Sequence, residues 1–160
     1  VRDVLGLAGM SATAFHGDSV GSAYGVRLAE PGYRRRPAFI NGMWLKGSAD
    51  LDGSAVDLQR FNAAFMDGRL LSAVSRDLMW SEWARVSPEI YYGLGWFIEH
   101  KAGYDIFSHT GSVPGYTSVN LIARRGDGAP WASVTILTNG EEVDGLDRLA
   151  ESLLDIAWAQ

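Results

Sequence analysis

Hydrophobic and polar positions follow different spacings in the two halves of the chain. In the first half, Leu58, Phe61 and Phe65 recur three or four residues apart, which is the spacing of one helix face. From residue 91 onwards, apolar side chains fall in short aromatic and β-branched runs separated by glycine-rich turns, a pattern typical of strands. We therefore expect an α+β domain in which helices precede a sheet and one helix follows it.

Three helices are predicted in this order. The first spans 54–67, because Ser54 can cap its N-terminus and Gly68 can take the left-handed conformation that often ends a helix. The second spans 72–79. The third spans 143–158 and carries its leucines and alanines on one face, so we expect it to pack against the sheet.

Four consecutive strands are expected to form an antiparallel meander, since the connections between them are short. They span about 91–99, 104–110, 116–124 and 131–138. The last strand reads WASVTILT, which is uncharged and rich in β-branched residues. An unpaired edge of such a strand would be a template for self-association.

The stretch 16–50 shows neither spacing. Glycine and proline recur through it with scattered aromatic residues, so we predict it to be irregular. Long segments of this kind are usually functional, and we interpret this one as a loop that covers a concave surface.

Composition and charge exclude several classes of protein. The 160 residues are 47% hydrophobic and 21% charged, as in ordinary globular domains. A net charge of −5 makes nucleic acid an improbable partner, because such domains are normally basic. We find no apolar run long enough for a transmembrane segment, and this chain shows no signal peptide.

Metal and thiol chemistry are not expected either. The chain has no cysteine, which excludes a disulfide scaffold and a cysteine nucleophile. Its three histidines, His16, His100 and His109, do not stand at metal-ligand spacing. We therefore expect neither a metal nor a cofactor.

The triplet His109-Thr110-Gly111 stands at the end of a predicted strand. A glycine on an open strand edge lets an extended substrate pair with the backbone, and a threonine hydroxyl can hold a carboxylate. A histidine can place an anion or relay a proton, and backbone N–H groups can stabilise an oxyanion. From these residues alone, the favoured interpretation is a strand end that enters a turn, with His109 a satisfied polar residue.

Six segments together resemble the serine β-lactamase and penicillin-binding-protein-like family. Leu5 to Phe15 is similar to the family pattern PLGM..T.F, and residues 92–96 read YGLGW, as in the family. The matching segments follow the family order and span 5–15, 47–61, 67–72, 92–96, 109–116 and 136–139. The likeness is greatest to class C β-lactamases, D-Ala-D-Ala carboxypeptidases and related esterases.

The resemblance implies part of a β-lactamase/transpeptidase-like fold and a role for each residue of the triplet. His109 falls at the Lys/His position, Thr110 would contact the substrate carboxylate, and Gly111 would permit close approach. The backbone N–H of Ser112 would be the second oxyanion donor. The family also suggests an extracytoplasmic location, periplasmic or secreted, while a cytoplasmic one stays open.

The chain departs from the family in its nucleophile. Neither Lys46 nor Lys101 completes a Ser-x-x-Lys motif, and Tyr-x-Asn is absent. Ser118-Val119-Asn120 spells Ser-x-Asn but follows the triplet, whereas the family motif precedes it, so we interpret it as a coincidence within the sheet. Since both missing motifs belong to the N-terminal half of the fold, we expect 1–160 to be a single partial domain, the C-terminal portion.

Two hypotheses remain. The chain is the substrate-binding half of an acyl-serine hydrolase for β-lactam, D-Ala peptide or ester substrates, inactive alone. Alternatively, it is a non-catalytic relative that binds a peptide, a glycan or a partner subunit. Under the first hypothesis, the missing half of the fold is a partner. We then expect the edge of 131–138 to be covered by another chain or by part of 16–50.

Overall fold

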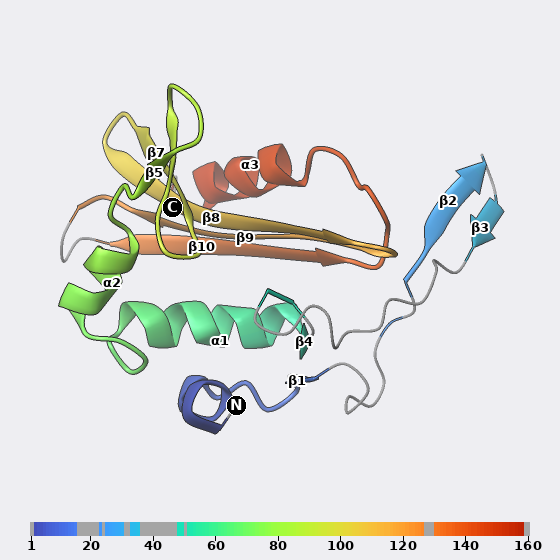
Figure 1. Ribbon diagram of the computed structural model, residues 1–160, viewed down its shortest axis with the longest axis horizontal. Helices are drawn as coiled ribbons and strands as arrows, with labels where there is room; N and C mark the ends of the chain where they lie inside the picture. The colour runs from blue at the N-terminus through green and yellow to red at the C-terminus, as the bar shows by residue number, and fades with distance from the viewer. Residues whose placement is uncertain are drawn as a thin grey trace.

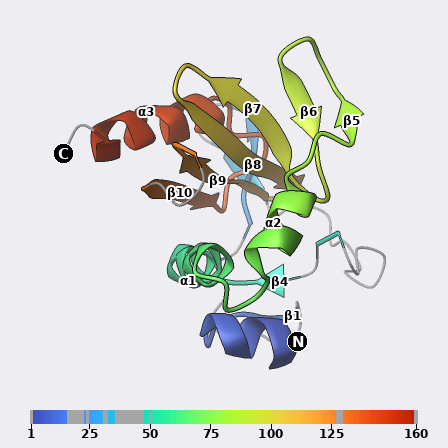
Figure 2. The same cartoon turned by 90° about the vertical axis from the view of Figure 1, so that its left-hand side faces the viewer.

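A six-stranded antiparallel sheet forms the middle layer of the computed structural model (Figure 1). Helix α3 covers one face of the sheet, while α1 and α2 lie on the other; Figure 2 shows these layers from the end. The structure describes residues 2–15, 23, 25–30, 33–35, 48–49, 51–126 and 130–158. The expected α+β class, with a C-terminal helix packed on an antiparallel sheet, is confirmed.

Each strand of the sheet pairs with the next one along the chain, so the sheet is the predicted meander. Two of the expected strands have the predicted bounds, and the strand that begins at Tyr104 runs three residues further than expected. The strands are β5 (Ala84–Arg85), β6 (Ile90–Tyr92), β7 (Phe97–Lys101), β8 (Tyr104–Val113), β9 (Tyr116–Arg124) and β10 (Trp131–Thr138).

The predicted single strand 91–99 is wrong, because this segment is a hairpin. Strand β6 ends at Tyr92, and β7 begins at Phe97 and pairs with Tyr92. Gly95 turns the chain at φ +83°, a conformation that glycine adopts without strain. Aromatic residues flank the turn on both sides, so the sequence reads as one continuous apolar strand.

The helices are α1 (Ala55–Met66), α2 (Ala73–Met79) and α3 (Leu146–Trp158). The first two agree with the predictions, including the cap at Ser54. The side-chain oxygen of Ser54 accepts a hydrogen bond from the backbone N–H of Asp57, and that of Ser72 accepts one from Ser75. Both N···O distances are 3.1 Å. Helix α3 begins three residues later than expected, because Gly145 turns the chain at φ +76° just before it.

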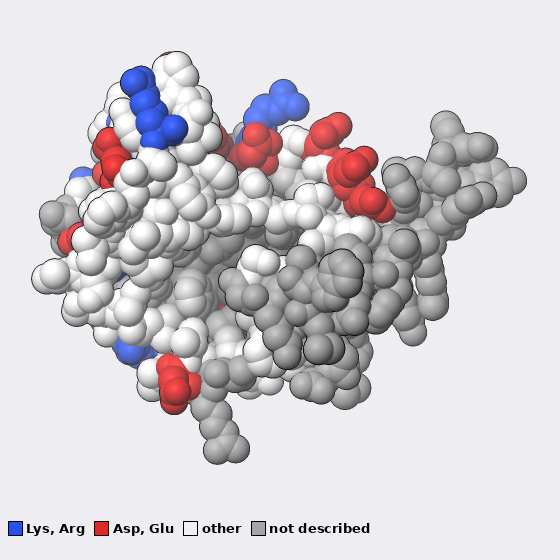
Figure 3. Space-filling view, in the orientation of Figure 1, with Lys and Arg blue, Asp and Glu red and all other residues white. Residues whose placement is uncertain are grey.

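Acidic side chains gather over the turn before α3 and its first residues (Figure 3). Glu142, Asp144 and Asp147 are exposed there, and Asp147 lies in the first turn of the helix. Negative charge at this end is favourable, because the free N–H groups of a helix N-terminus carry partial positive charge.

Short elements precede α1. They are the π-helical segment η1 (Arg2–Gly6), β1 (Ala14–Phe15) paired with β4 (Leu51–Asp52), and β2 (Arg27–Glu30) paired with β3 (Tyr33–Arg35). Strands β2 and β3 lie within the stretch 16–50, which the sequence predicts to be irregular. Their ribbon lies beyond the end of the sheet (Figure 1). Most of that stretch lies outside the described residues, so its covering role stays a prediction.

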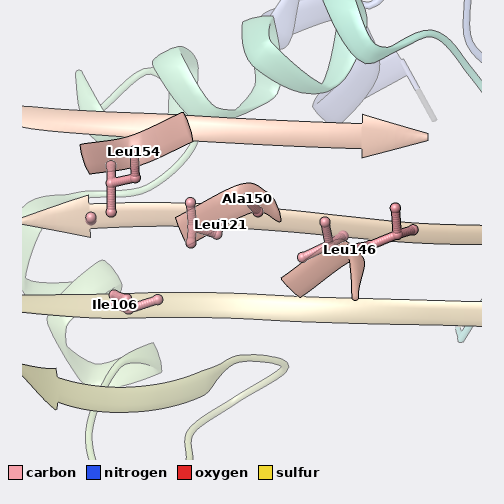
Figure 4. Packing of buried hydrophobic residues seen from close by; sticks show 7 residues of the cluster. Ile106, Leu121, Leu146, Ala150 and Leu154 are labelled. Carbon is pink, nitrogen blue, oxygen red and sulfur yellow. The ribbon is translucent and has the colours of Figure 1, made fainter. Parts of the chain in front are cut away.

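The core between α3 and the sheet uses one side of each element. Leu146, Ala150 and Leu154 recur every four residues on α3 and pack against Ile106 of β8 and Leu121 of β9 (Figure 4). Full burial of one such aliphatic side chain stabilises a fold by about 1.5–3 kcal/mol. This stripe is therefore what holds the C-terminal helix on the sheet.

The opposite face of the same strands builds a second core. Phe107 and Ile122, each next in sequence to a residue of the α3 core, pack with Phe65 of α1 and with Trp80 and Trp96. The rings of Trp80 and Phe107 are stacked, with centroids 3.6 Å apart. Residues 106–107 of β8 and 119–123 of β9 thus contribute to cores on both faces of the sheet, which places them at its centre.

Strand β10 is an edge of the sheet. Within the described residues it pairs with β9, and Val26 forms a parallel bridge with Gly140 just past its end. The described part of 16–50 therefore does not cover the length of this edge. Its covering by another chain stays a prediction. No helix in the described part of the chain is long and apolar enough to cross a membrane.

Candidate active site

The four residues singled out by the resemblance lie together at the end of β8, at 109–112. Three of the four residues are exposed and Gly111 is half-buried. Strand β7 pairs with β8 only as far as Ser108, whereas β9 pairs with it to the end of the strand. Over 109–113, β8 therefore has one edge that no described strand covers.

Hairpin geometry decides which backbone groups face this open edge. The two-residue loop 114–115 joins β8 to β9 and closes on a hydrogen-bonded pair of residues. Because such pairs alternate along an antiparallel ladder, the N–H and C=O groups of Thr110 and Ser112 point away from β9. An extended peptide could therefore pair with this edge as an added strand.

Gly111 is favoured by packing across the sheet. A Cβ atom at this position would lie 2.6 Å from Oγ of Ser118, its partner on β9. The contact lies between the two strands, so it favours glycine whether or not a substrate is bound. This reason differs from the close approach of a substrate that the resemblance implies.

Both ring nitrogens of His109 have partners. Nδ1 lies 2.6 Å from the carbonyl oxygen of Thr110, and Nε2 lies 3.1 Å from Oη of Tyr92. The rings of Tyr92 and Phe97 are 6.1 and 5.5 Å from the imidazole, centroid to centroid. The β6–β7 hairpin thus supplies two neighbours of the site that the sequence analysis missed. The only sequence signal for these two neighbours is the YGLGW segment, to which the resemblance assigns no role.

The Ser118-Val119-Asn120 segment lies on β9 inside the sheet, as expected. Asn120 exchanges two hydrogen bonds with Asn62 of α1, and Oγ1 of Thr135 donates a third to it at 2.7 Å. The amide of Asn120 is therefore occupied in holding α1 against the sheet.

Lys101 is held as a cation rather than as a base. Its Nζ donates to Oε2 of Glu99 at 2.9 Å, and this hydrogen bond keeps the pKa of Lys101 above its usual value. A general-base lysine needs the opposite shift. The other lysine, Lys46, lies outside the described residues.

Metal binding has no support in the described part of the chain. No group of three or more histidine, aspartate or glutamate side chains gathers there in a way that could hold an ion. The described residues of the site offer backbone hydrogen-bond groups, hydroxyls and an imidazole.

Comparison with known proteins gives the family. A profile of the beta-lactamase family matches residues 1–156. One similar solved structure is a penicillin-binding protein from Bacillus halodurans, with a TM-score of 0.77 at 19% identity. The match covers 97% of this chain and 48% of that one. A D-stereospecific amidohydrolase from Streptomyces sp. has a TM-score of 0.74, 20% identity, and coverages of 94% and 46%.

A third similar structure is the D-amino acid amidase from Ochrobactrum anthropi SV3 in complex with D-phenylalanine. Its TM-score is 0.65 at 19% identity, with coverages of 99% and 52%. At these identities the structural likeness establishes the fold alone. The chain spans about half the length of the solved structures it matches, and corresponds to part of the β-lactamase/transpeptidase fold. Because the family profile matches nearly its whole length, this chain belongs to the beta-lactamase family.

Proposed function

We propose that this chain is the substrate-binding half of an acyl-serine hydrolase acting on β-lactam, D-Ala peptide or ester substrates. The open edge of β8 over 109–113 carries the proposal, because it offers backbone groups to an extended acyl substrate. The nucleophile is a serine of a Ser-x-x-Lys motif in the portion of the fold that this chain does not span.

Each residue of the edge has a role in this reaction. The serine oxygen attacks the substrate carbonyl, and the bond to the leaving group breaks as the acyl-enzyme forms. The N–H of Ser112 stabilises the oxyanion, while the hydroxyl of Thr110 holds the substrate carboxylate. His109 carries a proton or balances the substrate's negative charge. Loss of one oxyanion donor typically lowers turnover by about 10²–10³.

The other portion of the fold is also the partner that covers β10. Strand β10 is long, uncharged and open on one side within the described residues, so a strand from that portion can extend the sheet. We also propose an extracytoplasmic location for the whole protein, which the family resemblance suggests, with a cytoplasmic one as the alternative.

The test begins with the coding sequence upstream of Val1. A Ser-x-x-Lys motif there supports the proposal, and the longer protein should be acylated by a β-lactam or a p-nitrophenyl ester, as seen by intact mass. The 160-residue chain alone should stay unlabelled, because it lacks the Ser-x-x-Lys motif.

In the longer protein, Thr110→Val should lower turnover without unfolding, whereas Thr110→Ser, which keeps the hydroxyl, should retain most of it. Full activity of both His109→Ala and Thr110→Val would contradict the assigned roles. A start codon at or near Val1 would instead favour a non-catalytic binding module.

A further inference from the structure

We infer that Tyr92 is a positioning residue for His109, whose imidazole it holds across the open edge of β8 in one tautomer. The contact itself is a property of this chain, and its catalytic consequence rests on the proposed function. Tyr92 lies on β6, two strands away from β8, and sequence spacing alone does not connect the two residues.

The hydrogen bonds of His109 determine where its proton lies. The carbonyl oxygen of Thr110 can only accept, so Nδ1 at 2.6 Å from it must carry the hydrogen. In the neutral imidazole, Nε2 is then an acceptor, and the hydroxyl of Tyr92 at 3.1 Å donates to it. The Thr110 carbonyl thus selects the Nδ1–H tautomer, and the Tyr92 hydroxyl, which can donate or accept, holds the ring where that bond forms.

The ring of Tyr92 is itself fixed. Tyr92 pairs with Phe97 across the β6–β7 hairpin, and their rings meet edge to face with centroids 4.8 Å apart. Phe97 in turn pairs with Ser108, directly before His109. The β6–β7 hairpin thus carries the Tyr92 hydroxyl, and the pairing of β7 with β8 sets its position relative to His109.

The position of the imidazole matters for the site. The Thr110 carbonyl faces the open edge, so the Nδ1–H bond of His109 occupies an acceptor that an added strand would otherwise use. Tyr92 therefore determines where the ring stands, and in that position the Thr110 carbonyl keeps the proton on Nδ1 and leaves Nε2 unprotonated. Without the hydroxyl, the ring can turn and the other tautomer becomes populated.

The experiment uses the 160-residue chain with ¹⁵N-labelled histidine at about pH 8.5, two units above the ordinary imidazole pKa. The wild type should show His109 with a protonated Nδ1 and an unprotonated Nε2. Tyr92→Phe, which keeps the ring and its contact with Phe97, should move both shifts toward the average of two tautomers. The signals of His100 should stay unchanged.

Tyr91→Phe is the matched control. Tyr91 is the neighbour on β6, packs with the core on the other face, and has its ring near His100 rather than His109. It should leave the His109 nitrogen shifts as in the wild type, and circular dichroism should show all three proteins folded.

Two results would overturn the inference: a wild-type His109 that is already a mixture of tautomers, or a folded Tyr92→Phe variant with wild-type shifts. The first needs no variant, so a Tyr92→Phe protein that fails to fold leaves the inference testable. Neither measurement requires a nucleophile, so its failure is distinct from a failure of acylation. In the longer hydrolase, Tyr92→Phe should lower kcat by about 3- to 10-fold, the effect of one hydrogen bond, with a smaller change in KM.

Discussion

The side-chain amides of Asn62 on α1 and Asn120 on β9 hydrogen-bond each other twice. Nδ2 of Asn62 lies 2.8 Å from Oδ1 of Asn120, and the reciprocal distance is 2.9 Å. Asn62 is completely buried. Asn120 is the cross-strand partner of His109, so this pair fixes α1 beneath the part of the sheet that carries the candidate site.

Asn62→Ala should destabilise the chain by about 1–3 kcal/mol, because it empties a fully buried site and removes both hydrogen bonds between the two amides, leaving Asn120 with Thr135 alone. The measurement is urea unfolding of the wild type, both single alanine variants and the double variant. The two substitutions should be strongly non-additive, since the second removes a group whose bonds to its partner amide the first has already removed. Additive losses would show that the pair does not act as a unit.

Asp57 should make stability fall in acid. Burial alone would raise its pKa, but hydrogen bonds from Thr13, the Ala12 N–H and Arg60 outweigh it and hold the pKa of Asp57 below its usual value. A group with a lowered folded-state pKa stabilises the fold above its unfolded pKa of about 3.9, and this stability is lost as pH falls through the folded value.

Asp57→Asn tests this linkage. Its unfolding free energy should be about 1–3 kcal/mol below that of the wild type at neutral pH, as for a damaged buried hydrogen-bond network. The difference should shrink as the pH is lowered from about 5 toward 2. Glu89→Gln is a suitable control, because Glu89 is exposed and lies outside this hydrogen-bond network. A constant difference across this range would contradict the linkage.

His100 should make the stability of the chain fall as the pH rises. Its Nδ1 lies 2.7 Å from Asp105 and its Nε2 lies 2.9 Å from Glu82, and these hydrogen bonds raise the pKa of His100. A raised folded-state pKa gives stability that is fully present below the unfolded pKa of about 6.5 and is lost as pH rises through the folded value.

Thermal unfolding from about pH 5.5 to 9 should therefore show the largest difference between wild type and His100→Gln on the acid side. The curves should converge at alkaline pH, where the imidazole is neutral in both states. Because the imidazole is half exposed, salt should weaken the effect. A difference in Tm that grows with pH would have the wrong sign for this interpretation.

Gly111→Ala separates the two reasons for glycine in the triplet. The added methyl would meet Oγ of Ser118 at 2.6 Å, so we expect a loss of about 1 kcal/mol, partly relieved by rotation of the serine. Ser118→Ala removes that oxygen and should restore stability in the double variant, as measured by urea unfolding. If the double variant of the longer hydrolase is stable yet inactive, Gly111 also serves the substrate. A double variant no more stable than Gly111→Ala would refute the steric explanation.

The sequence by itself determined the elements whose signals are local. Helices α1 and α2 lie where predicted because Ser54, Ser72 and the helical spacing act within a few residues. The order of β8, β9 and β10 followed in the same way, since short turns force neighbouring strands to pair. The triplet His109-Thr110-Gly111 was visible because it stands together on one strand.

Only the tertiary structure decided what brings distant residues together. The turn at Gly95 was hidden, because an apolar segment with two glycines fits one strand as well as a hairpin. The contact of Tyr92 with His109 depends on the register of two hairpins, and the Asn62–Asn120 pair joins residues 58 apart in sequence. Local propensity carries no information about such contacts, because their geometry is set by how the sheet twists and how α1 packs beneath it.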